Sequence, residues 1–205
     1  MKTLTIYGDN INERLIDEAV EALRNGEIIV YPTDSLYAMG CDALNVRAVE
    51  RLCRLKGINP TKNRLAIICA DLSQASRYVR IDNRTFDILK TRLPGPFTFI
   101  LPASNALPKT FRGRKEVGLR IPDDPVAIAL AERLEGPLMT TTLHLADADH
   151  DTMVTASAEI AEEIGQGDNV ALMIDSGSKG LTPTTVVNLL DPSNPEIIRQ
   201  GSAEF

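Results

Sequence analysis

The sequence predicts one layered α/β domain built on an open, twisted sheet. Short apolar segments with strand character alternate along the chain with segments of helical periodicity, which is the pattern of such domains. The 205 residues can build one substantial core, and no break in composition divides them. The hydrophobic content of 43% and charged content of 24% are typical of a soluble globular protein. We therefore expect a single domain over residues 1–205.

The N-terminal part of the chain contains two expected helices around one expected strand. Asn10 is a candidate cap for a helix with one apolar stripe, which ends near Asn25-Gly26. A β-branched strand is expected at 27–31. Asn45 is a candidate cap for the second helix, and Lys56 falls in the last turn of that helix.

The rest of the chain continues this alternation. We expect strands at 65–69, 97–101, 117–121, 139–143, 170–174 and 185–190, and helices starting at 71 and spanning 82–90, 125–134 and 158–164. Pro125 suits the first turn of its helix, and Asp123 or Asp124 can cap that helix.

A polar corner follows the strand at 27–31. Pro32 ends the strand and fixes φ, so that Thr33, Asp34 and Ser35 leave the sheet in one direction. Three small oxygen-bearing side chains at a strand end suit a ligand site better than a core. Asp34 or Ser35 could equally cap a turn, as isolated residues of these types commonly do. Residues 33–35 are therefore a candidate ligand site.

Basic residues gather in two segments, although the net charge of −6 argues against nucleic-acid binding over the whole surface. Residues 47–64 contain six basic residues against one acidic residue, and residues 109–120 contain five against one. If the fold joins these segments, they form a basic cleft suited to nucleotide phosphates and to RNA. Two separate solvated faces are the equal alternative.

The remaining composition bounds the class of protein. Cys41, Cys53 and Cys69 lack the close pairing of a zinc or redox site, so we expect reduced, mostly buried thiols. No run approaches the ~18 apolar residues that span a bilayer, and Met1-Lys2-Thr3 leads into a short strand-like segment rather than a signal peptide. The histidines and aspartates at 144–151 fit no metal motif, so we expect an exposed acidic turn. We expect a cytoplasmic protein without a membrane partner.

Motifs beyond the corner carry a resemblance to a known family. Residues 32–40 read Pro-Thr-Asp-Ser-Leu-Tyr-Ala-Met-Gly, and six further motifs follow in order: Lys56-Gly57, Leu93–Thr98, Val117–Pro122, Pro137-Leu138 with Thr140–Leu143, Pro183–Val187 and Ile198–Gly201. The chain thereby resembles the YrdC/YciO family, whose opening signature is Pro-Thr-Asp-Thr/Ser-x-Tyr-Gly/Ala-x-Gly. The resemblance covers residues 28 to 201, and residues 37–41 and 69–73 look more like the YciO branch.

The resemblance implies both a fold and an activity. The fold is a YrdC/RibB-like α+β three-layer arrangement, with a mixed sheet, helices on both sides and a concave pocket. The activity is that of an L-threonylcarbamoyladenylate synthase, a nucleotidyltransferase that converts threonine, bicarbonate and ATP to threonylcarbamoyl-AMP and pyrophosphate. This product serves tRNA N6-threonylcarbamoyladenosine formation. ATP is then a substrate, and Mg²⁺ is expected to arrive with the nucleotide.

The resemblance also implies roles for individual residues. The amino acid would be bound by Thr33, Ser35, Tyr37, Thr141 and Arg120, with the Arg120 guanidinium pairing the carboxylate in two bonds. The nucleotide would be bound by Lys56, Pro183, Thr184, Thr185 and Arg199. Catalytic roles would fall on Lys56, Thr142 and His144. We expect the cations and the corner to meet across a single hollow.

Three positions depart from the family's pattern. Active synthases have arginine, serine and asparagine where this chain has Ile58, Thr142 and His144. The family's next histidine is also absent near residues 68–70. Loss of one charge-assisted contact is worth ~1.5–3 kcal/mol, or roughly ten- to a hundredfold in rate. The chain is therefore expected to be a synthase, or a YciO-like binder of tRNA or double-stranded RNA with weak or no synthase activity. A pocket for another nucleotide or another small acid is a third alternative. The sequence does not determine its oligomeric state.

Overall fold

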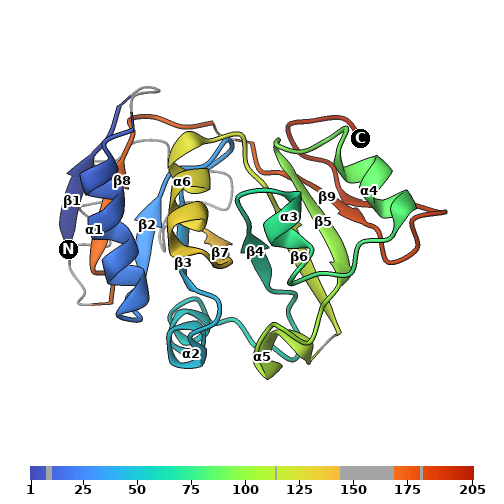
Figure 1. Ribbon diagram of the computed structural model, residues 1–205, viewed down its shortest axis with the longest axis horizontal. Coiled ribbons are helices and arrows are strands. Elements are labelled where there is room, and N and C mark those ends of the chain that lie inside the picture. The colour runs from blue at the N-terminus through green and yellow to red at the C-terminus, as the bar shows by residue number, and fades with distance from the viewer. Residues whose placement is uncertain (8–10, 114, 144–168, 181) are drawn as a thin grey trace.

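A ten-stranded mixed sheet organises the computed structural model, which describes residues 1–7, 11–113, 115–143, 169–180 and 182–205 (Figure 1). The strand order is β1-β8-β2-β3-β7-β4-β6-β5-β9-β10. The strands are β1 (Lys2–Thr5), β2 (Ile29–Tyr31), β3 (Ala38–Asp42), β4 (Ala66–Ile68), β5 (Phe97–Pro102), β6 (Glu116–Arg120), β7 (Leu138–Thr142), β8 (Leu172–Asp175), β9 (Thr185–Asn188) and β10 (Glu196–Arg199).

Helices cover both faces of this sheet, which confirms the predicted α/β architecture. The described helices are α1 (Glu13–Arg24), α2 (Val46–Leu55), α3 (Leu72–Ala75), α4 (Asn83–Leu89), α5 (Lys109–Arg112) and α6 (Pro125–Leu134). Helices α1 and α6 pack on one face, against an apolar cluster that includes Ile29, Ile68 and Leu138. Helices α2 to α5 supply residues to a larger cluster on the other face.

Side-chain caps begin the helices much as the sequence predicts. The Asn45 side chain accepts from the Ala48 N–H at the start of α2, and Lys56 is the C-cap residue of that helix. The Asp124 carboxylate accepts from the Val126 and Ala127 N–H groups and thereby begins α6. The first helix differs, because its cap is Asn12 rather than Asn10.

Three elements lie where the sequence predicted none. Strand β3 is buried on both faces, so its residues show no alternation of apolar and polar types. Strand β10 is exposed at all four positions and has no apolar pattern. Helix α5 spans four residues, too few for a helical periodicity. The helix expected at 158–164 lies outside the described residues.

Two further sequence predictions concern the thiols and the membrane. All three cysteines are buried and free, as expected, and burial raises the pKa of the Cys69 thiol to about 12. Within the described part of the chain, each helix is too short or too polar to cross a bilayer.

Candidate functional site

The corner after β2 is ordered by its own hydrogen bonds. The Thr33 hydroxyl donates to the Leu36 carbonyl at 2.6 Å and accepts from the N–H groups of Ser35 and Leu36 at 3.2 and 3.3 Å. The Thr33 and Ser35 hydroxyls lie 3.1 Å apart. Thr33 is 0% exposed and Ser35 is 4% exposed, so both hydroxyls lie inside the protein. The hydrogen bonds of the turn hold them in fixed positions there.

Arg120, the last residue of β6, reaches this corner from another part of the sheet. Arg120 pairs with Ile68 of β4, so its side chain lies on the face of the sheet that α6 covers. Its Nη2 donates to Asp34 Oδ1 at 2.9 Å, to Ser35 Oγ at 3.2 Å and to Thr33 Oγ1 at 3.4 Å. Arg120 is 7% exposed, and its Nε is buried without a hydrogen-bond partner.

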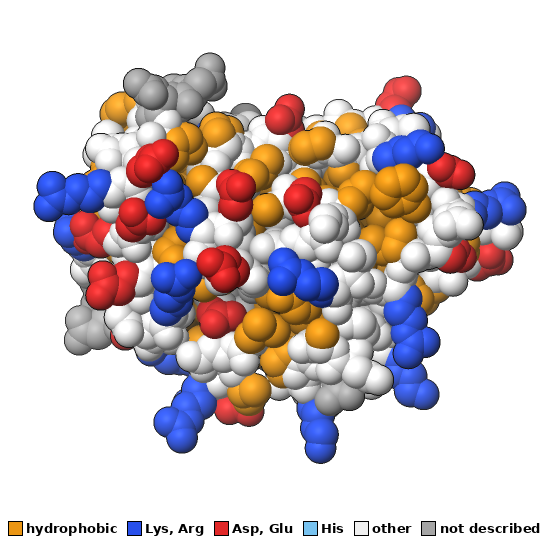
Figure 2. All heavy atoms as spheres, viewed as in Figure 1, with side chains coloured by type: hydrophobic (Ala, Val, Ile, Leu, Met, Phe, Trp, Pro, Cys, Tyr) orange, Lys and Arg blue, Asp and Glu red, His pale blue; other side chains and the backbone are white. Residues whose placement is uncertain are grey.

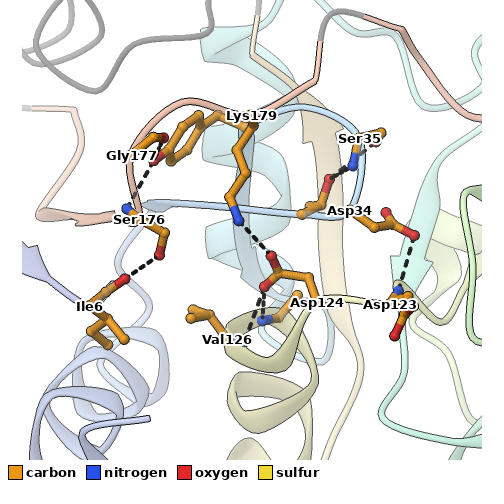
Figure 3. Close-up of polar contacts among 12 residues, drawn as sticks. Ile6, Asp34, Ser35, Asp123, Asp124, Val126, Ser176, Gly177 and Lys179 are labelled. Carbon is orange, nitrogen blue, oxygen red and sulfur yellow. Dashed lines mark hydrogen bonds and ion pairs between the residues drawn. The ribbon is translucent and has the colours of Figure 1, made fainter. Parts of the chain in front are cut away.

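Asp34 is the charged partner of Arg120. Its second oxygen, Oδ2, accepts from the Asp123 N–H at 3.0 Å (Figure 3). Burial raises the pKa of the Asp34 carboxyl, and the nearby Arg120 guanidinium only partly opposes this shift. The attraction between Asp34 and Arg120 therefore offsets only part of the free-energy cost of removing the two charges from water.

A strap formed by residues 176–180 crosses the corner (Figure 3). Tyr37 holds its start, because the phenol hydroxyl donates to the Gly177 carbonyl at 2.7 Å and accepts from the Ser176 N–H at 2.9 Å. Lys179 forms an ion pair with Asp124 at 3.0 Å. A side chain at Gly180 would meet the Ser35 carbonyl at 3.0 Å, so the strap lies directly against the corner.

Burial controls the ionisation of the tyrosine beneath the strap. It raises the pKa of Tyr37 to about 12, so the phenol is neutral at physiological pH and both donates and accepts a hydrogen bond.

A second polar group lies on β9 and β10. Arg199 Nη2 donates to the Thr184 carbonyl at 2.9 Å and to its hydroxyl at 3.3 Å. The Thr184 hydroxyl lies 2.8 Å from that of Thr98 on β5. Burial and the positive charge of Arg120 lower the pKa of Arg199, so the two guanidiniums repel each other across this part of the sheet. An anion between them would relieve that repulsion.

The neighbouring segment is packed tightly against its own backbone. The Thr185 hydroxyl donates to the Ala203 carbonyl and accepts from the Gly201 N–H. The Pro183 carbonyl accepts from the Ser202 N–H. A Cβ at Gly201 would lie 2.3 Å from the Pro183 oxygen, so glycine is required for this approach.

Strand β7 brings its threonines beside the corner. Thr142 pairs with Ala38 and Thr141 with Met39, and the Leu143 N–H donates to the Tyr37 carbonyl. Cross-strand partners share a face, so Thr142 lies on the α6 side with Arg120, whereas Thr141 lies on the opposite face. His144 lies outside the described residues.

Lys56 occupies a different place. It ends α2, which follows the end of β3 away from the corner. Among the described residues, no hydrogen bond or ion pair joins its ammonium to another group, and burial lowers its pKa. A hollow of about 470 Å³ near the end of α2 is lined by Glu50, Cys53, Arg54 and Gly57–Pro60, and Lys56 is not part of its lining. Among the described residues, hydrogen bonds thus join Arg120 to the corner, whereas Arg199 bonds to Thr184 and no such contact joins Lys56 to the corner.

The fold brings the two basic segments together. A Cβ at Gly113 would lie 3.7 Å from the Pro60 oxygen, and Arg64 forms a 2.7 Å ion pair with Glu116. Figure 1 shows α2 and α5 along the lower edge of the molecule, and Figure 2 shows Lys and Arg side chains projecting from that edge. One basic edge therefore results, in place of two separate faces.

Sequence reasoning gave no specific role to three residues at or near the site. Asp34 belonged to the candidate ligand site at 33–35, but its pairing with Arg120 was not predicted. Thr98 lies inside the Leu93–Thr98 motif without an assigned role. Lys179 has no signal in the sequence, because its contact with Asp124 depends on where the strap lies.

Comparisons with known proteins agree with this fold. The E. coli protein YciO is 38% identical over 198 residues, 96% of this chain and 93% of that protein. Its crystal structure superposes with a TM-score of 0.90 and covers 100% of this chain and 98% of the other. The threonylcarbamoyl-AMP synthase of Vibrio vulnificus is 27% identical over 91% of this chain and 98% of its own length.

A ligand complex is among the similar structures. P. abyssi Sua5 complexed with L-threonine has a TM-score of 0.85 and 27% identity, and covers 98% of this chain and 58% of the Sua5 chain. Residues 21–201 match the profile of the Sua5, YciO and YrdC proteins, described as "Telomere recombination". This chain therefore belongs to the Sua5/YciO/YrdC family.

Proposed function

We propose that this protein binds L-threonine at Arg120 and ATP beside Arg199, and joins them with bicarbonate as threonylcarbamoyl-AMP. The observation that carries the proposal is the Arg120 guanidinium, which is fixed at the hydroxyl-lined corner and has an unpaired, buried Nε. Buried donors are almost always paired, so this one favours an anionic ligand. The L-threonine complex of a related Sua5 protein supports the amino acid as that ligand.

The arrangement suits the chemistry of this reaction. The threonine amino nitrogen would attack bicarbonate to form a carbamate, with loss of water. A carbamate oxygen would then attack the α-phosphorus, and pyrophosphate would leave. Arg120 would hold the amino acid, while Arg199 and the hydroxyls of Thr98 and Thr184 would face the phosphates. Mg²⁺ would bind mainly through phosphate oxygens.

Calorimetry with each substrate separately tests the binding half of this proposal. Wild-type protein is expected to bind L-threonine and ATP, and Arg120→Lys is expected to lose at least about tenfold in threonine affinity, because lysine keeps the charge but not the two-bond geometry. Arg133→Lys on the surface of α6 is the matched control and should bind as wild type does.

Pyrophosphate release tests the chemical half. Threonine, bicarbonate and Mg²⁺-ATP together should release pyrophosphate, and omission of threonine should abolish the release. Binding of both substrates without any turnover at high enzyme concentration would contradict synthase activity while leaving the binding site in place.

RNA binding is a second candidate function, favoured by the single basic edge. Arg47 and Arg54 of α2 and Lys109 of α5 are exposed, and Figure 1 shows both helices along the lower edge of the molecule. Phosphate contacts would make the affinity fall steeply with salt. Arg47→Glu with Arg54→Glu should weaken binding to tRNA or double-stranded RNA and reduce the salt slope by about two. Lys90→Glu, at the C-cap of α4, is the control, and RNA binding that does not respond to salt would contradict this function.

A further inference from the structure

The partner that Arg120 has inside the protein satisfies it only in part. Asp34 contacts the guanidinium through one oxygen, because its other oxygen accepts from the Asp123 N–H. Nη2 shares its hydrogen bonds among three acceptors, whereas Nε has none. The carboxylate nearest to Arg120 therefore leaves one buried donor unused.

The unused donor lies on the edge of the guanidinium that best matches a carboxylate. Nε–H and one Nη2–H point the same way and can donate in parallel to the two oxygens of one carboxylate. An incoming carboxylate at this edge would replace the single Asp34 contact at Nη2 and would also pair Nε. The ligand would thus make two charge-assisted bonds where Asp34 makes one.

We propose that Asp34 is an exchangeable counter-ion for Arg120, which occupies the guanidinium in the empty protein and is displaced by the carboxylate of the amino acid substrate. This inference rests on the proposed binding of L-threonine at Arg120. Asp34 thereby sets the affinity for the substrate without contacting the reacting atoms, as a positioning residue acting through Arg120.

The strength of the internal pair fits such an exchange. Burial raises the pKa of Asp34 despite the adjacent guanidinium. The ion pair therefore offsets only part of the desolvation free energy of the carboxylate. Asp34 also keeps a second anchor in the Asp123 N–H, to which it can remain bound when it leaves Arg120. Figure 3 shows this carboxyl between the corner and Asp123. Removal of the Asp34 charge should therefore improve ligand binding without loss of folding.

The experiment compares carboxylate binding in wild type and Asp34→Asn by calorimetry, with L-threonine and L-threoninamide as probes. L-threonine should bind about tenfold tighter to the variant, the value of one charge-assisted contact. The amide lacks the carboxylate and should gain nothing. Asp123→Asn removes an equal charge from the neighbouring exposed side chain and should change threonine affinity less than about twofold. Urea unfolding should show no loss of stability in Asp34→Asn.

A purely structural role for Asp34 predicts the opposite, namely weaker threonine binding together with lower stability, and that result would overturn the proposal. So would equal threonine affinities in the two proteins. If neither protein binds threonine, the proposed substrate fails, and the Arg120 Nε–H resonance is then titrated with sodium acetate. Asp34→Asn should respond at about tenfold lower acetate concentration, and identical titrations would refute the exchange.

Discussion

One face of the sheet has two halves with opposite properties. Under α1 and α6, β2, β8 and the first part of β7 present apolar side chains such as Ile29, Leu138 and Ile174, all fully buried. Further along the same face, β6, β5 and β9 present Arg120, Thr98 and, just before β9, Thr184. The same face of the sheet therefore packs against helices in one half and carries a polar site in the other.

The difference between these halves shows how the site is made. Apolar side chains in the first half are satisfied by contact alone, whereas each polar group in the second half needs a partner with the right geometry. The polar half supplies most of these partners internally and leaves one donor of Arg120 over. Changes in the apolar half should therefore alter stability, and changes in the polar half should alter binding.

The largest expected effect is in the apolar half. Leu23→Ala on α1 leaves a cavity in the cluster and should cost about 2–5 kcal/mol in the free energy of unfolding, measured with urea. The protein that remains folded should bind threonine normally. Leu44→Ala, at an exposed position, should cost less than about 0.5 kcal/mol. If the folded Leu23→Ala protein lost threonine binding, the apolar half would also control binding, and the proposed difference between the halves would be wrong.

The next effect is in the polar half. Arg199→Gln should weaken ATP binding by about tenfold or more, because glutamine cannot replace a charged donor to phosphate. Threonine binding at Arg120 should stay the same or weaken slightly, since the bound carboxylate no longer relieves a repulsion between the two guanidiniums. Calorimetry measures both, with Arg84→Gln on α4 as the control. Unchanged ATP affinity would place the nucleotide elsewhere.

A smaller effect is expected where the halves meet. The Tyr31 hydroxyl donates to the Thr140 hydroxyl at 2.9 Å inside the sheet. Tyr31→Phe should cost about 1–2 kcal/mol, because it leaves the buried threonine oxygen without its donor. Tyr78→Phe removes a hydroxyl that has no such partner among the described residues and should cost less than about 0.5 kcal/mol. Equal losses in urea unfolding would show that the bond contributes nothing.

The smallest effect is a dependence of stability on pH. Burial raises the pKa of Asp34 above its ordinary value of 3.8, so the folded protein binds this proton more tightly than the unfolded chain does. The stability gained by protonation is complete below 3.8 and is lost as the pH rises through the raised pKa. Arg120 and Asp124 are the charged groups that act on this titration.

Urea unfolding between about pH 2.5 and pH 7 measures this dependence. Relative to Asp34→Asn, wild type should become more stable as the pH falls. Asp82, whose pKa is lowered by the Thr85 N–H, is the comparator of opposite sign, because its contribution exists above 3.8 and is lost on acidification. If the free energy of unfolding changes with pH equally in wild type and Asp34→Asn, the pKa of Asp34 is not raised in the folded protein.

The sequence predicted those parts of the fold that local chemistry determines. Helix α6 has the predicted bounds because Asp124 and Pro125 mark its start. Strands β3 and β10 were missed because neither shows a local alternation of apolar and polar residues. Strand β3 is buried on both faces between β2 and β7, whereas β10 is exposed at every position beside β9. The corner at Thr33 and Ser35 was visible in the chain. Its pairing with Arg120 depends on the register of β4 with β6, which no local pattern encodes.

The order of the chain has a consequence for biosynthesis. Thr184 and Arg199 belong to the last strands, and β9 pairs with β5, which is made much earlier. Strands β1 and β2 likewise pair with β8, so their region also waits for residues made late in the chain. The group formed by Thr98, Thr184 and Arg199 can therefore assemble only after residues 184–199 have been made, whereas the residues of the corner and Arg120 are made earlier.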